Sequence, residues 1–162
     1  MKTLLRTLLF LSLIVWLGAE VFFPVIAAVT FTTLPDTHVA GSIVGQLLRT
    51  LHWMGLISGL VALLLLAIAP TWGIYKSRSV LIPMVLLLLM IGATAYSQFG
   101  IIPSMERDRI AAGGAIDNAD KTSPQTIHFN KLHRRSTLVE EIVLLFGIAT
   151  VVFVARAETI RA

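Results

Sequence analysis

Seven ionisable side chains are crowded between His128 and Glu141: two histidines, three basic residues and two carboxylates. Imidazole together with carboxylate is a donor set that suits a borderline divalent metal ion. On a helix, His133, Thr137 and Glu140 share a face, because residues four and seven positions apart lie one above another. His128 falls on a different face. We therefore expect only the other three side chains to approach a common site.

Three polar side chains from other parts of the chain are expected at the same depth, namely Glu20, His52 and Gln98. Glu20 interrupts a long apolar run. An ionisable residue inside a membrane is energetically costly, which makes it a candidate for function. A structural hydrogen bond or ion pair from Glu20 to His52 or Arg49 is the competing interpretation. His52, beside Trp53, also fits an interfacial anchor.

Together these residues predict a polar pocket in the bundle that opens to one surface. It would suit a small polar ligand, a lipid headgroup or a metal ion, whereas pairing of Glu140 with Arg134 or His133 would make Glu140 structural. Two histidines at one depth, His52 and His133, could also ligate a haem. Haem or a divalent metal ion is thus the alternative to a protein without a cofactor. The candidate pocket residues are Glu20, His52, Gln98, His133, Thr137 and Glu140.

The composition is typical of a membrane protein. Hydrophobic residues make up 56% of the chain, the mean hydropathy is +0.85, and charged residues make up 14%, against about a quarter in soluble domains. The chain has no cysteine, which excludes disulfides, thiolate metal sites and cysteine nucleophiles. The net charge of +4 lies in loops and tails, so we expect no nucleic-acid partner.

Four long apolar runs predict an all-α membrane protein, a four-transmembrane-helix bundle that forms one domain over residues 1–162. We expect Pro24 to kink the first helix and Pro103 to end the third. Asp36 and Ser123 are expected N-caps. Helices two and four are expected to extend beyond the bilayer on the same side, because no proline interrupts them after the first turn. The predicted spans are about residues 7–29, 51–69, 80–102 and 137–155, with a polar loop at 103–123 in which a short helix is expected around 106–112.

The balance of basic residues does not fix the orientation. By the positive-inside rule the side richer in Lys and Arg faces the cytoplasm. The basic start of the first helix favours cytoplasmic termini, and we expect a multi-pass protein of the bacterial inner (cytoplasmic) membrane. The terminal side carries six basic residues, Lys2, Arg6, Lys76, Arg78, Arg156 and Arg161, and the other carries seven, Arg49, Arg107, Arg109, Lys121, Lys131, Arg134 and Arg135.

Two groups of residues carry a resemblance to a known family. The first comprises Trp16-Leu-Gly-Ala19, Phe22-Phe23, Phe31, Leu34, Ala40-Gly41 and Leu51-His-Trp53, and the second His128, Leu132-His133 and Ser136-Thr137. Through them nearly the whole chain resembles the transmembrane-protein-205-like family, also described as domain of unknown function 4149. The resemblance implies four membrane spans and no established biochemical activity in bacteria. The family often has an asparagine where this chain has Glu140, so a carboxylate replaces an amide in any shared pocket.

These observations favour a non-enzymatic role, since no catalytic motif is present. We expect a small-ligand or ion-binding protein, or an accessory subunit of a larger membrane complex. The alternatives are a haem- or metal-binding redox protein and a small-solute transporter, which with four spans would have to be an oligomer. The expected partners are the lipid bilayer and a second copy or a larger complex. Gly41 with Gly45, and Gly55 with Gly59, have the GxxxG spacing that lets another helix approach closely.

Overall fold

The computed structural model describes residues 1–159, so Arg161, counted above among the basic residues of the tail, lies outside the described part. Within it the secondary structure is entirely helical, and four stretches are long and apolar enough to span a membrane. This confirms the predicted all-α four-span class. The helices are α1 (Lys2–Thr33), α2 (Thr37–Ile68), α3 (Ser77–Tyr96), the π-helix η1 (Ser97–Ile101), α4 (Ile102–Ala111), the 3₁₀-helix η2 (Ile116–Asn118) and α5 (Pro124–Thr159).

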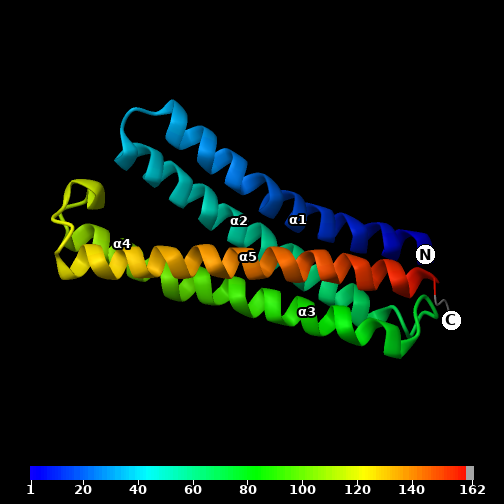
Figure 1. The fold of residues 1–162 in the computed structure, drawn as a ribbon. Coiled ribbons are helices and arrows are strands. Elements are labelled where there is room, and N and C mark those ends of the chain that lie inside the picture. The colour runs from blue at the N-terminus through cyan, green and yellow to red at the C-terminus, as the bar shows by residue number, and fades with distance from the viewer. Residues whose placement is uncertain (160–162) are drawn as a thin grey trace.

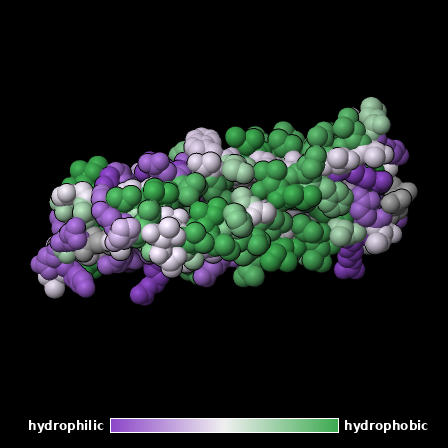
Figure 2. All heavy atoms as spheres, turned by 90° about the horizontal axis from the view of Figure 1, so that it is seen from above, coloured by the Kyte–Doolittle hydropathy of each residue, from purple (hydrophilic) through white to green (hydrophobic). Residues whose placement is uncertain are grey.

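All four membrane-spanning stretches are longer than a bilayer requires. They contain 32, 32, 35 and 36 residues, or about 48 to 54 Å at 1.5 Å per residue, against a hydrocarbon core of about 30 Å. The second and fourth therefore extend beyond the bilayer as predicted, and the first and third do so as well. The start of α1 and the end of α5 lie at one end of the bundle, opposite the α1–α2 and α4–α5 turns (Figure 1). An apolar belt separates the two polar ends (Figure 2).

The bundle is built from two helix pairs. α1 packs chiefly on α2 and α3 on α5, and contacts between α2 and α3 join the pairs. The α1 face that packs inward recurs with helical spacing at Leu5, Leu9, Leu13, Trp16 and Glu20, because residues three and four apart lie on one side of a helix. The other faces of α1 carry exposed apolar side chains, as expected for a lipid-facing surface.

Two glycines of α2 allow this close packing. A Cβ built on Gly55 would lie 2.5 Å from Nε1 of Trp16, and one built on Gly59 would overlap the six-membered ring of the same indole. This GxxxG pair therefore serves contact within the chain. A Cβ on Gly41 would come no nearer than 4.0 Å to any side chain, and one on Gly45 would meet nothing within 4 Å.

The prediction that Pro103 ends the third helix was wrong. The chain continues from α3 through η1 into α4, so the short helix expected around 106–112 is the direct continuation of the third helix and begins at Ile102. Proline cannot donate a backbone hydrogen bond, and its ring crowds the carbonyl four residues earlier, here that of Phe99. The helix accommodates this by widening just before Pro103, where the Ile102 N–H bonds to the Ser97 carbonyl five residues back. Pro24 likewise lies inside α1 without ending it.

Both predicted caps are present. The Asp36 carboxylate accepts hydrogen bonds from the backbone N–H groups of His38 (2.8 Å) and Val39 (3.2 Å). The Ser123 hydroxyl accepts one from the Thr126 N–H at 3.2 Å. These bonds satisfy N–H groups that the first helical turn leaves without a partner. The starts of α2 and α5 are thereby fixed at the end of the bundle away from the termini.

Polar contacts join α1, the α2–α3 turn and α5 at the end of the bundle where α1 begins. The Tyr75 hydroxyl, in the turn between α2 and α3, donates a hydrogen bond of 2.5 Å to Glu158 of α5. The same carboxylate oxygen forms an ion pair with Arg6 of α1 at 3.3 Å. Lys2 Nζ donates to the Gly73 carbonyl at 3.1 Å. Burial and the hydrogen bond to Glu158 raise the pKa of Tyr75 above its ordinary value.

Candidate functional site

A fully buried histidine lies at the centre of the polar residues of the bundle. Nδ1 of His52 is 2.9 Å from Oε1 of Gln98, and Nε2 is 2.8 Å from Oε1 of Glu140. An amide oxygen only accepts hydrogen bonds, so Nδ1 carries a hydrogen with the amide in this orientation. Nε2 and Glu140 then share a second hydrogen, either as imidazolium with carboxylate or as imidazole with carboxylic acid. The geometry is that of a hydrogen-bonded acid–base pair.

Glu140 still has capacity to bind a positive charge. Its Oε1 also accepts a hydrogen bond of 3.2 Å from the Ser97 hydroxyl. Its Oε2 is buried and has no hydrogen-bond partner among the described residues. A carboxylate oxygen without a partner in a buried site is energetically costly. Glu140 therefore presents an acceptor that no described group of the protein satisfies.

Glu20 brings a second carboxylate to the same region. It is 5% exposed, and its Oε1 accepts a hydrogen bond of 3.1 Å from the indole N–H of Trp16, one helical turn earlier on α1. It interacts electrostatically with both Glu140 and His52. The sequence suggested His52 or Arg49 as a structural partner of Glu20. Neither forms a hydrogen bond with it, because both ring nitrogens of His52 bond other residues and Arg49 is exposed.

We call Glu20, His52, Ser97, Gln98 and Glu140 the intramembrane cluster. Each of the four spanning stretches contributes to this cluster. α1, α2 and α5 contribute one residue each, and η1 contributes the adjacent residues Ser97 and Gln98. Adjacent residues of an α-helix point about 100° apart. Here, however, Ser97 bonds Glu140 and the next residue, Gln98, bonds His52. The wider turn of η1 lies at this position, and π-helical segments are frequent at functional sites.

His133 and Thr137 do not join the cluster. Both side chains are exposed. His133 stacks on Phe129 with ring centroids 6.4 Å apart, and the Thr137 hydroxyl bonds back to the His133 carbonyl. At about 100° per residue, His133 and Thr137 lie about 20° and 60° from Glu140 around the axis of α5, in the direction away from the buried face. Glu140 itself is at the edge of the buried face. That face is formed by Leu132, Ser136, Val143, Gly147, Thr150 and Val154.

The structure gives no support to the haem and metal alternatives. The two histidines proposed to face one another are separated, because His52 is buried between Gln98 and Glu140 whereas His133 is exposed. Among the side chains that the structure describes, which leave out Asp117, no group of three or more His, Cys, Asp or Glu is arranged to hold a metal ion. His128 is also engaged separately, 2.7 Å from Asp108 of α4.

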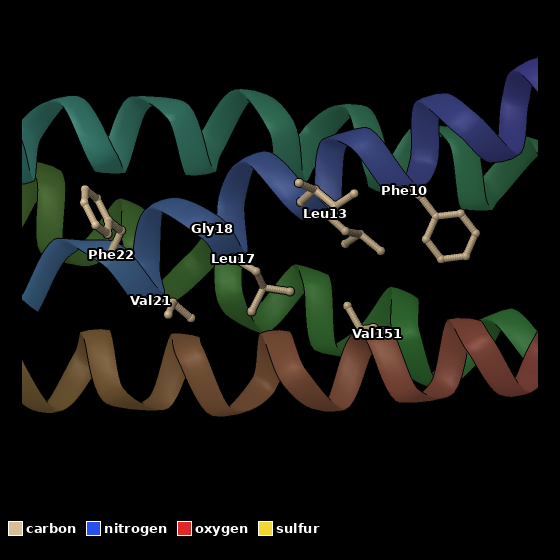
Figure 3. A pocket seen from close by; sticks show the side chains of 8 residues that line it. Phe10, Leu13, Leu17, Gly18, Val21, Phe22 and Val151 are labelled. Carbon is tan, nitrogen blue, oxygen red and sulfur yellow. The ribbon is translucent and has the colours of Figure 1, made fainter. Parts of the chain in front are cut away.

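Two surface grooves flank α1, and both are lined by apolar residues almost throughout. One, of about 480 Å³, lies between α1 and α2. The other, of about 460 Å³, lies between α1 and α5 (Figure 3). No residue of the intramembrane cluster lines either groove. The α1–α5 groove is lined by Phe10, Leu13, Ile14, Leu17, Gly18, Val21, Phe22 and Val151.

Two residues that form hydrogen bonds in this region, Trp16 and Ser97, were not among the candidates predicted from the sequence. Trp16 precedes Glu20 by four residues, so helical spacing could have identified it as the neighbour of that carboxylate. Ser97 had no comparable signal, because α-helical geometry would have directed it away from the face of Gln98.

A family model described as "Domain of unknown function (DUF4149)" matches residues 11–109. The match covers more than half of the chain and includes Glu20, His52, Ser97 and Gln98, whereas Glu140 lies outside it. No curated protein and no solved structure matches this chain.

Proposed function

The chain belongs to the DUF4149 family, and from the intramembrane cluster we propose that it is a non-enzymatic integral membrane protein that reversibly binds a proton within its helix bundle. The carrying observation is the hydrogen-bonded pair of His52 and Glu140, with a second carboxylate, Glu20, in electrostatic range. Both groups of the pair can hold the shared hydrogen. The proposal therefore requires no group that the cluster lacks.

A charge count supports the binding of one further proton. The pair of His52 and Glu140 with its shared hydrogen is neutral in sum, so an ionised Glu20 leaves the cluster with one negative charge. Uncompensated charge in an apolar bundle is costly. One more proton, on Glu20 or on the unpartnered Oε2 of Glu140, neutralises the cluster. Binding and release of that proton is the event we assign to the protein.

The proposal is tested by infrared difference spectroscopy of the purified protein in lipid nanodiscs during a change of pH. The expected result is a carbonyl-stretch band from a protonated carboxyl group that titrates with pH. Glu20→Gln and Glu140→Gln should each alter or remove it. The matched control is Glu141→Gln, which removes the same charge from the exposed neighbouring position of α5 and should leave the band unchanged.

Two outcomes would overturn the proposal. One is a band that is identical in the wild type and in both cluster variants, since the titrating carboxyl group would then lie elsewhere. The other is suppression of the band by sodium ions, but not by choline, at fixed pH. That result would identify the bound ion as an alkali cation rather than a proton.

A further inference from the structure

Three neighbouring cations in the first half of α5 have no partner among the residues that the structure describes. Lys131, Arg134 and Arg135 are all exposed, and none of them forms an ion pair or side-chain hydrogen bond with a described side chain. Arg109, on α4, is instead paired with Glu106 at 2.6 Å. We call Lys131, Arg134 and Arg135 the basic face.

An apolar stripe continues directly from the basic face. Leu138, Ile142 and Leu145 are 55%, 37% and 65% exposed. They follow Lys131 by 7, 11 and 14 positions, which places them within about 40° of it around the helix at about 100° per residue. Arg134 and Arg135 lie on either side of the same line. The exposed side of α5 is thus cationic in its outer part and apolar below.

The change from basic to apolar occurs over a short distance. Arg135 and Leu138 are three residues apart, a rise of about 4.5 Å along the axis. The cations are therefore at the level where lipid headgroups meet the hydrocarbon region. The nearest carboxylate on this side of α5 is the exposed Glu141, seven residues and about 10 Å beyond Arg134, too far for an ion pair.

We propose that the basic face binds the phosphate of an anionic phospholipid whose acyl chain lies along Leu138, Ile142 and Leu145. Three unpaired cations complement a lipid with net negative charge, and Arg binds phosphate oxygens in a bidentate manner. The exposed apolar stripe is where the chain of a lipid held at the basic face must pass. This site is separate from the intramembrane cluster, which occupies the opposite, buried side of α5.

The test is a titration of the detergent-solubilised protein with phosphatidylglycerol or phosphatidylcholine, with lipid-bound species counted by native mass spectrometry. We expect tighter binding of phosphatidylglycerol. The triple variant Lys131→Gln, Arg134→Gln, Arg135→Gln should weaken it at least about tenfold and leave phosphatidylcholine binding unchanged. The control variant removes three exposed cations from the other end, Lys76→Gln, Arg78→Gln and Arg156→Gln, and should retain the preference.

Each remaining outcome has a defined meaning. An equal loss in both triple variants would overturn the proposal, because it would reflect total charge rather than a site. Competition by inorganic phosphate at the concentration of the lipid would also overturn it, because the acyl stripe would then contribute nothing. The double variant Arg134→Lys, Arg135→Lys retains the charge and should recover most of the affinity. Failure to recover it while the melting temperature is unchanged would assign the binding to guanidinium geometry alone and refute the charge argument.

Discussion

Replacement of Gly59 by alanine tests whether the packing of α1 on α2 positions Glu20. The new methyl group would overlap Cζ3 of Trp16 and lie 3.0 Å from two further ring atoms, whereas ordinary contacts are 3.4–4 Å. The indole is rigid and 1% exposed, so it would have to retreat by roughly 1 Å. Its N–H holds the Glu20 carboxylate at 3.1 Å, and the same movement strains that bond.

The expected cost follows from these contacts. Overpacking of a well-packed interior costs about 1–3 kcal/mol, and loss of the indole hydrogen bond adds about 1 kcal/mol. Replacement of glycine by alanine also stabilises a helix by up to about 1 kcal/mol, because alanine has the higher helix propensity. The matched control, Gly18→Ala, removes this last contribution, because a Cβ there meets nothing within 4 Å. We expect Gly59→Ala to be about 2–4 kcal/mol less stable than Gly18→Ala.

The assay is reversible unfolding in mixed micelles, followed by circular dichroism and by tryptophan fluorescence. Circular dichroism gives the free energy of unfolding. With Trp53 and Trp72 replaced by phenylalanine in both variants, fluorescence reports the environment of Trp16 alone. If the two variants agree within about 0.5 kcal/mol, the indole adapts without cost and the reasoning fails. In that case Glu20 would be held by something other than the fit of Trp16 against α2.

Two further predictions concern the ends of the bundle. Asp36→Ala should cost about 1 kcal/mol and speed amide exchange at the start of α2, because two N–H groups lose their acceptor; unchanged exchange at His38 and Val39 would contradict the capping role. Because the pKa of Tyr75 is raised from 10.0 by burial and by Glu158, the folded protein keeps that proton longer than the unfolded chain, so wild-type stability should fall as pH rises above 10. Tyr75→Phe should flatten that decline in pH-dependent unfolding, and equal slopes would count against it.

The sequence predicted the class of fold better than it predicted which face each helix packs inward. The length and apolar content of the four runs predict four helices, because a helix must be long and apolar to span a bilayer. Asp36 and Ser123 indicate where two helices begin, because their side chains can cap the first backbone N–H groups. The side that α5 buries was not predictable in the same way. A membrane helix is apolar on its lipid face as well as on its packed face, so hydrophobic periodicity, which assigns faces in soluble helices, gives little information.

The candidate residues show the same limit. Glu20, His52, Gln98 and Glu140 stand out because polar groups are rare in apolar runs, and in the structure His52 contacts both Gln98 and Glu140. His133 shares a helical face with Glu140 by spacing, but spacing alone does not tell which side of that face is packed.

The π-helix η1 has a consequence for how the third spanning helix tolerates changes in length. Removal of one residue from 97–101 would let α-helical hydrogen bonding run unbroken. A π-helical turn holds one residue more than an α-helical turn for about the same rotation and rise, so α4 would keep its orientation and Asp108 would still face His128, its partner at 2.7 Å. The change would be local, because Ser97 and Gln98 would no longer share the wide turn from which one bonds Glu140 and the other His52. Deletions in this segment should therefore disrupt the intramembrane cluster and leave the α4–α5 contact intact.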